Sequence, residues 1–295
     1  MNTRQMDCIL ELAQTLNFGK AAANLFMSQP TLTYQVNAAE EEVGFRIFDR
    51  SGRGTTLTAA GAQFAASLRG IRAELRKAVE QGQNFSAKYR ENIRIALPIR
   101  SALHFLPDAI RQICSEDPGI VVSTTFDWNH AIDLFMQGEE DVLFAYSGDV
   151  AHLHDVELHP IFDSGIFLVL RRDDPLAGRK LAEPEDLKGR TLMVGGPSQS
   201  PLRRVQQRMI ATGWIDYFNS DDHDTSLTNV AAGRAVVLSP GFLNDHTGEF
   251  AWIPFDCQER LPCVICTHGY EKRESVKRFV ELLCSLHQPH QGYAP

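Results

Sequence analysis

The sequence has no hydrophobic stretch long enough to cross a membrane. Its longest apolar run, Ile166 to Leu170, is far shorter than the roughly 20 residues that span a bilayer as a helix. The first residues (MNTRQMDC) also lack the basic-then-apolar pattern of a secretory signal. We therefore expect a cytoplasmic protein with no membrane partner.

Motifs of catalysis and cofactor binding are also missing. The sequence has no nucleophile elbow around a serine, no phosphate-binding glycine loop, no paired-metal carboxylate motif and no dinucleotide-binding fingerprint. It therefore predicts no catalytic residue, no cofactor and a protein that is not an enzyme.

The chain has only six cysteines, and they form no disulfide framework. Cys263 and Cys266 are spaced as CxxC, but they lie in an apolar, strand-like run (LPCVICT) and no second pair follows at zinc-finger spacing. This favours buried structural thiols over a metal site. His152, His154 and His159 (HLHDVELH) are spaced so that they could share a face, but loop and strand-edge histidines are more common than metal ligands. We expect no bound metal.

The chain as a whole has no excess of basic residues. Its net charge of -8 argues against a nucleic-acid-binding protein when taken alone. The charge is uneven, because residues 1 to 90 hold 11 Lys and Arg against 8 Asp and Glu (+3), whereas residues 91 to 295 hold 18 against 29 (-11). Only the N-terminal part is suited to approach a phosphate backbone. The 295 residues are enough for two or three domains.

The N-terminal part contains a pattern typical of two short helices joined by a tight turn, in the stretch FGKAAANLFMSQPTLTYQVN. In the first helix, Phe18, Ala21, Ala22 and Leu25 recur at three-to-four-residue intervals and share one face. The alanines are small enough for a second helix to pack closely across them. This is the outline of a helix-turn-helix.

The second helix of the pair has its own start signal. Ser28 is suited to cap it, and Pro30 falls in the first turn, where a proline removes no internal hydrogen bond. The apolar residues then follow at steps of four, three and four: Leu32, Val36, Ala39 and Val43. The polar residues on the other faces are placed to reach base edges in a major groove. Periodicity alone does not distinguish this pattern from an ordinary helical hairpin with a solvated face.

The order of these and later residues resembles the LysR-type transcriptional regulators. In the N-terminal part the matching positions are Phe18, Ala21, Ala22, Leu25, Ser28, Gln29, Pro30, Leu32, Gln35, Glu40, Gly44, Phe48, Asp49, Arg50, Leu57, Thr58 and Gly61. Further along they are Leu106, Pro107, Gly138, Asp141, Asp174, Pro175, Leu176, Ala177, Asp186, Leu187, Ala232, Gly233 and a terminal helix around Phe279.

The resemblance implies a multidomain fold. Residues 1–57 would form a winged helix-turn-helix, and residues 58–86 a linker and dimerisation helix. The rest would form an α/β effector domain of the periplasmic-binding-protein type 2, with lobe I from residues 91–162 and 266–295 and lobe II from residues 163–265. Crossing strands near residues 158–163 and 261–267 would join the two lobes.

The linker helix shows apolar residues that alternate at steps of four and three, like a coiled-coil seam: Phe64, Leu68, Ile71, Leu75, Ala78 and Gly82. We favour dimerisation through this seam over packing within its own domain, because little chain lies beside the helix. The resemblance extends this expectation to a homodimer or a homotetramer.

The resemblance also implies which residues contact double-stranded DNA. Gln29, Pro30, Thr31 and Thr33 match residues that read or position the family on DNA, and residues 50–56 resemble the wing, whose arginines would meet phosphate or the minor groove rather than point into solvent. Tyr34 and Asn37 depart from relatives, which often have basic residues there. Between residues 29 and 45 there is no Lys or Arg, so phosphate attraction falls to Lys20, Arg46, Arg50 and Arg53. The predicted DNA-binding residues are Lys20, Ser28, Gln29, Pro30, Thr31, Thr33, Tyr34, Asn37, Arg50 and Arg53.

Beyond the polar stretch 84–90 the pattern changes to strands that alternate with helices. The expected strands cover residues 93–97, 120–126, 141–146, 165–170, 191–194 and 235–238, with one more near Cys263. The expected helices cover residues 101–115, 129–137, 200–212, 225–233 and 273–286. This order predicts a mainly parallel sheet in each lobe.

A cleft between two such lobes offers free helix N-termini to an anion. The candidate loops are residues 98–101, 127–130 and 195–200. The family usually has Ser or Thr at the position of Arg100 or Ser101, and an arginine there favours an anionic effector, a carboxylate before a phosphate. The alternatives are an Arg100 that points to solvent or pairs with an acid, and serines that only cap helices. The predicted effector-binding residues are Arg100, Ser101, Trp128, Asn129, Ser198, Gln199, Ser200 and Thr225.

The predicted function is a sequence-specific DNA-binding transcriptional regulator of LysR type that is controlled by a small effector. RNA polymerase is a further candidate partner. The alternative is a cytoplasmic metabolite-binding module that does not bind DNA, with N-terminal helices that serve only for oligomerisation.

Overall fold

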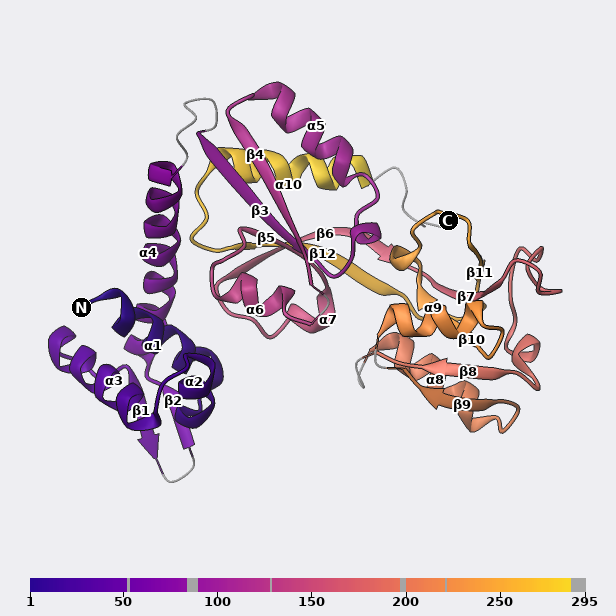
Figure 1. Ribbon diagram of the computed structural model, residues 1–295, viewed down its shortest axis with the longest axis horizontal. Helices are drawn as coiled ribbons and strands as arrows, with labels where there is room; N and C mark the ends of the chain where they lie inside the picture. Colours follow the sequence, from indigo (N-terminus) through magenta and orange to yellow (C-terminus); the bar gives the residue numbers. More distant parts are fainter. Residues whose placement is uncertain (52–53, 84–89, 128, 197–199, 221, 288–295) are drawn as a thin grey trace.

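The computed structural model of the chain describes residues 1–51, 54–83, 90–127, 129–196, 200–220 and 222–287. Figure 1 shows an N-terminal helical domain with one long helix rising from it, a first α/β lobe beside that helix and a second α/β lobe at the far end. This order confirms the predicted fold of a winged helix-turn-helix, a linker helix and a two-lobed α/β domain.

The N-terminal domain consists of α1 (Thr3–Thr15), α2 (Phe18–Asn24) and α3 (Gln29–Val43), followed by the hairpin of β1 (Phe48–Ser51) and β2 (Gly54–Leu57). Each helix begins at a residue whose side chain accepts a hydrogen bond from a free backbone N–H group: Asn2, Asn17 and Ser28. The apolar stripe predicted for α3 is fully buried and forms the core with α1 and α2.

The linker helix is α4 (Ala59–Gln83). At its start the Thr58 hydroxyl accepts a hydrogen bond from the N–H of Gly61 at 2.9 Å. Leu68 is fully buried in the N-terminal core, but the apolar seam further along is on the surface, where Ile71, Leu75 and Val79 are 53%, 44% and 49% exposed. This half of the seam has no apolar partner in the described part of the chain.

Lobe I is built on a five-stranded sheet in the order β4-β3-β5-β12-β6. The strands are β3 (Glu91–Leu97), β4 (Ile120–Phe126), β5 (Val142–Tyr146), β6 (Val156–Ser164) and β12 (Leu261–His268). β3 runs parallel to β4 and β5, as predicted, and β12 runs antiparallel between β5 and β6. The helices α5 (Leu106–Glu116) and α10 (Glu274–His287) pack on one face, and α6 (Ala131–Met136) and α7 (Ser147–Val150) on the other.

Cys263 and Cys266 belong to opposite faces of this sheet. Cys263 is buried against α10, whereas Cys266 is buried on the side of α6. Burial raises the pKa of Cys266 to about 12. The two thiols therefore cannot share a ligand, and among the described residues no group of three or more His, Cys, Asp or Glu is arranged to hold a metal ion. None of the described helices combines the length and the apolar character needed to cross a membrane.

Lobe II has a second five-stranded sheet, in the order β11-β7-β10-β8-β9. The strands are β7 (Ile166–Arg171), β8 (Thr191–Val194), β9 (Asp216–Asn219), β10 (Val236–Pro240) and β11 (Phe250–Pro254), and they are parallel between β10, β8 and β9. The helices α8 (Pro201–Ala211) and α9 (His223–Ala231) cover opposite faces. The sequence did not predict the edge strands β9 and β11.

The chain crosses between the lobes twice, from β6 into β7 and from β11 into β12. β6 and β12 pair antiparallel along their whole length, so the expected crossing strands lie side by side. The predicted limit between residues 265 and 266 falls inside β12, all of which pairs within the sheet of lobe I.

Candidate DNA-binding surface and effector cleft

The face of α3 that points away from the core carries the polar residues predicted to read DNA. Residues 28–30 are exposed where the helix begins, and Tyr34 is 69% exposed one turn further on. Thr31 and Thr33 are half-buried, and the Thr31 and Ser28 hydroxyls share a hydrogen bond of 2.8 Å. Neither threonine is enclosed by protein, so α3 presents a ridge that base edges in a groove can reach.

Arg50 on the wing strand β1 lies across this motif. Its guanidinium donates a hydrogen bond of 2.7 Å to Oδ1 of Asn37, and its Cζ lies 4.6 Å from the centre of the Phe18 ring. The contact brings a positive charge to a helix that has no Lys or Arg of its own. Lys20 is exposed on α2, and Arg53 lies outside the described residues.

Glu40 is a residue that the resemblance included without a role. It is only 6% exposed, and its carboxylate accepts hydrogen bonds from the N–H groups of Ile47 at 2.7 Å and Phe48 at 2.9 Å. It also pairs with Arg46 at 3.2 Å. These donors belong to the turn that leads into β1, so Glu40 fixes the wing relative to α3.

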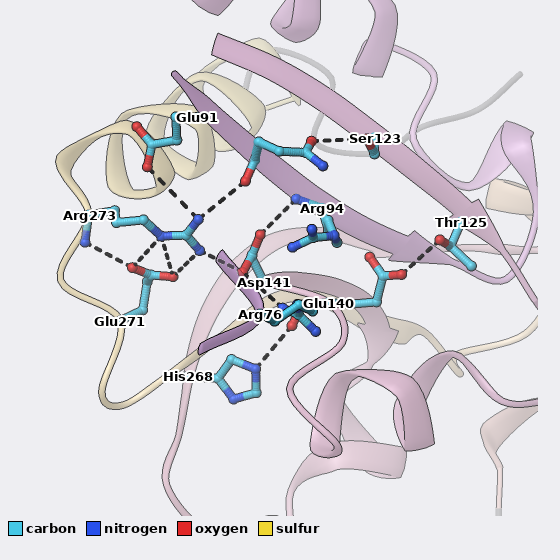
Figure 2. Close-up of polar contacts among 11 residues, drawn as sticks. Arg76, Glu91, Arg94, Ser123, Thr125, Glu140, Asp141, His268, Glu271 and Arg273 are labelled. Carbon is cyan, nitrogen blue, oxygen red and sulfur yellow. Dashed lines mark hydrogen bonds and ion pairs between the residues drawn. The ribbon is translucent and has the colours of Figure 1, made fainter. Parts of the chain in front are cut away.

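A network of charged side chains joins the linker helix to lobe I (Figure 2). Asp141, which immediately precedes β5 and is 6% exposed, lies at its centre. Its carboxylate pairs with Arg273 at 2.6 Å, accepts a hydrogen bond from the backbone N–H of Arg94 at 2.8 Å and lies 3.9 Å from Arg76 of α4. The linker helix is therefore in contact with its own effector domain, contrary to the expectation that it has little chain beside it.

Two further ion pairs extend this network. Nε of Arg273 donates to Glu271 at 2.9 Å, and burial acts to raise the pKa of Glu271, but the hydrogen bonds and charge of Arg273 outweigh it and leave that pKa below its usual value. On α4, Arg69 pairs with Asp155 of lobe I at 3.1 Å. The linker helix thus meets lobe I at two places along its length.

Three stacked rings lie beneath the linker helix. The His268 ring, at the end of β12, lies between Phe135 (centroids 4.1 Å apart, planes at 6°) and Tyr270 (4.6 Å, 10°). Its Nε2 lies 3.1 Å from the carbonyl oxygen of Glu140, to which it can only donate (Figure 2). Burial lowers the pKa of His268 to about 4, so the ring is neutral at pH 7. A Cβ on Gly70 of α4 would meet the Tyr270 ring at 3.6 Å, so the helix backbone lies directly on the stack.

A cavity of about 630 Å³ lies between the two lobes, which is a size typical of small-molecule sites. Lobe I contributes the end of β5 and α7, and lobe II contributes β8, β10 and the first turns of α8 and α9. The lining side chains with polar groups include Tyr146, Asp149, Ser200, Arg203, Gln206, His223 and Ser239.

Only one described residue of the predicted effector set lines this cavity. That residue is Ser200, which also caps α8 by accepting a hydrogen bond from the N–H of Arg203. The others that can be placed lie elsewhere: Arg100 is exposed, and neither it nor Ser101, Asn129 or Thr225 is on the cavity wall. Trp128, Ser198 and Gln199 lie outside the described residues. The structure therefore offers no support for an anion bound by Arg100, and the interpretation in which Arg100 points to solvent fits better.

The sequence missed most of the polar groups on the cavity wall. Asp149 follows β5 on α7, and burial raises the pKa of its carboxyl group. His223 begins α9, and burial lowers the pKa of its imidazole. Ser239 is 2% exposed, and its hydroxyl has no hydrogen-bond partner among the described residues. Only Arg203, three residues after a helix-capping serine, had a signal in the sequence.

Comparison with known proteins bears on both sites. Residues 3–62 match the family profile described as the bacterial regulatory helix-turn-helix protein of the lysR family, and residues 86–286 match the LysR substrate binding domain. The chain belongs to the LysR family. This LysR-family protein is a DNA-binding transcriptional regulator with an effector-binding domain.

Individual relatives agree with this assignment over the whole chain. The Escherichia coli protein YbhD, described as an uncharacterized HTH-type transcriptional regulator, is 27% identical over 291 residues, which cover 95% of this chain and 90% of YbhD. Full-length OxyR from Pseudomonas aeruginosa has a TM-score of 0.58 at 22% identity and covers 100% of this chain and 99% of its own. CbnR in complex with its target DNA has a TM-score of 0.55 at 21% identity, with coverage of 96% and 99%. At these identities the two structures support the fold.

Proposed function

We propose that this LysR-family protein is a cytoplasmic regulator without enzymatic activity that reads double-stranded DNA with the exposed face of α3. The proposed domain limits are those given by the resemblance: residues 1–57, 58–86, and two lobes from residue 91 onward. The observation that carries the proposal is the position of Arg50, which the side chains of Asn37 and Phe18 hold on the DNA-reading face of a helix without basic residues. The proposed DNA contacts are Lys20, Ser28, Gln29, Pro30, Thr31, Thr33, Tyr34, Asn37, Arg50 and Arg53.

We propose that the protein acts as a dimer or as a tetramer built from dimers. The exposed seam of Ile71, Leu75 and Val79 on α4 supports this, because an apolar stripe at coiled-coil spacing is stabilised by a second helix. A dimer would place two copies of α3 on two half-sites of the operator at a fixed spacing. RNA polymerase is a further candidate partner of the DNA-bound protein.

We propose that the effector binds in the cavity between the lobes. A ligand that binds the closed cleft better than the open one shifts the protein towards closure, and the relative placement of the lobes changes with it. Because α4 contacts lobe I through Asp141 and Asp155, such a change is felt at the base of the DNA-binding domain. In this way effector binding would alter the spacing of the two α3 helices.

The experiment is selection of binding sites from a random duplex library, followed by fluorescence anisotropy on the selected duplex. Replacing Arg50→Gln should weaken binding by about tenfold, which is about 1.4 kcal/mol. The matched control is Gln207→Ala, an exposed side chain on α8 of lobe II, which should leave the affinity unchanged. Equal losses in both variants would contradict the assigned DNA-binding surface. Failure to select any sequence would favour the alternative of a metabolite-binding module without DNA binding.

A further inference from the structure

The cavity between the lobes carries opposite charges on its two walls. Asp149 belongs to α7 of lobe I, and Arg203 belongs to the first turn of α8 of lobe II. A ligand that touches both walls therefore meets a carboxylate on one side and a guanidinium on the other. The chemistry of these two side chains restricts which ligands the cavity can hold.

Neither charge is neutralised by the protein. Asp149 is half-buried, and its carboxylate has no hydrogen-bond donor or ion-pair partner among the described residues. The only side-chain contact of Arg203 in that part of the chain is with the neutral amide of Gln206, at 3.4 Å. Burying a charged group without a partner is unfavourable, so both groups favour a ligand that brings the opposite charge.

A third polar group on the wall lacks a partner. Ser239, on β10, is 2% exposed, and its Oγ is buried without a hydrogen bond in the described structure. A buried hydroxyl without a partner destabilises the protein, and a ligand with a polar group can supply the missing hydrogen bond. This hydroxyl points to a ligand independently of the two charges.

The rest of the wall is apolar and excludes a highly charged ligand. The apolar lining includes Leu143, Ala145, Val194, Leu202 and Val237. The second carboxylate on the wall, Asp222, is already occupied as the cap of α9, where it accepts hydrogen bonds from the backbone N–H and the hydroxyl of Thr225. With one guanidinium against two carboxylates, the cavity disfavours a phosphate or a dicarboxylate.

We propose that the effector is a small zwitterion with an apolar body, whose ammonium group pairs with Asp149 of lobe I and whose single carboxylate pairs with Arg203 of lobe II. Amino acids with apolar side chains are the simplest members of this class. The inference rests on the proposed function of the cavity as the effector site, and it replaces the anionic effector expected from the sequence. Because the two charges belong to different lobes, only a ligand with both groups rewards closure of the cleft.

The test uses the full-length protein and three probes that share one body: L-phenylalanine, 3-phenylpropionate and 2-phenylethylamine, with L-leucine, 4-methylpentanoate and 3-methylbutylamine as a second set. Binding is measured by isothermal titration calorimetry and by the shift in melting temperature. In at least one set the zwitterion should bind at least tenfold more tightly than either singly charged analogue. Absence of binding by both zwitterions, or a singly charged analogue that binds as tightly, would overturn the proposal.

Two conservative variants assign the charges. Asp149→Asn should remove the preference for the zwitterion over the carboxylate probe, and Arg203→Gln should remove the preference over the amine probe. The matched controls are Asp256→Asn and Lys188→Gln, which change exposed charges away from the cavity wall and should keep both preferences. If either cavity variant keeps its preference in full, the proposed pairing is wrong.

A separate measurement distinguishes the ligand class from the function of the cavity. The anisotropy of the selected duplex is measured with and without the zwitterion that binds. A zwitterion that binds through Asp149 and Arg203 and changes the affinity for DNA supports both proposals. One that binds in this way without any effect on DNA binding supports the ligand class and contradicts the effector role of the cavity.

Discussion

Acid should destabilise lobe I through His268, and the size of the effect follows from the burial of this ring. Burial lowers its pKa from the ordinary 6.5 to about 4, so the folded protein binds this proton less tightly than the unfolded chain does. The stability that the neutral ring provides is therefore present above pH 6.5 and is lost as the pH falls towards 4. Between pH 7.5 and pH 5.0 the two pKa values correspond to a loss of about 2 kcal/mol.

The assay is urea unfolding followed by circular dichroism at both pH values, with amide hydrogen exchange of β12 to locate the loss. In His268→Gln the side-chain amide can still donate to the carbonyl of Glu140, but it does not titrate. This variant should be less stable at pH 7.5, because the ring stack is interrupted, yet its loss between pH 7.5 and pH 5.0 should be about 2 kcal/mol smaller than that of the unchanged protein. The control is His154→Gln, at an exposed position, which should keep the full pH dependence. The reasoning is refuted if His268→Gln also keeps it.

Two other predictions concern the linker helix and lobe II. Leu75→Glu places a charge in the exposed seam of α4 and should shift the protein from dimers towards monomers in sedimentation velocity, because a buried charge opposes helix pairing. In lobe II, Asp174 accepts two hydrogen bonds from Arg190, at 2.6 and 2.9 Å, and these lower its pKa. Asp174→Asn should cost about 1–3 kcal/mol at pH 7 in urea unfolding, and this cost should shrink as the pH falls below the ordinary carboxyl pKa of 3.8.

Both predictions have controls within the chain. Glu74→Gln changes a neighbouring charge on the linker helix and should leave the dimer intact; monomers in this variant as well would contradict the assignment of the seam. Asp133→Asn, on α6 of lobe I, should leave the stability of lobe II unchanged. A cost of Asp174→Asn that did not depend on pH would show that Arg190 does not stabilise the carboxylate.

The helix-turn-helix was predictable because local signals and burial agree there. Ser28 caps the helix that its position predicts, and Leu32, Val36 and Ala39 are fully buried as their spacing requires. The strands β9 and β11 were missed because both lie at edges of the lobe II sheet, and the burial of their residues comes from pairing with distant segments. No local pattern encodes such pairing.

The ligand cavity was harder to predict than the DNA-binding surface. Its polar groups come from α7, α8, α9 and β10, and they meet only after two lobes have folded and the chain has crossed between them twice. Arg100 drew attention because it differs from the family at one position, but its side chain is exposed on the surface of lobe I. Asp149 follows a buried strand with no motif around it, so its role depends on tertiary structure.

The short strand β5 connects the two sites of lobe I. Asp141, which holds the linker helix, precedes its first residue, whereas Tyr146 and then Asp149 follow at its other end, on the ligand cavity. Five residues of strand span about 17 Å. The strand is hydrogen-bonded on both sides, to β3 and to β12, and it is too stiff to lengthen or shorten. A displacement along its axis at the cavity end therefore reaches the anchor of the linker helix undiminished, like the movement of a rod pushed from one end.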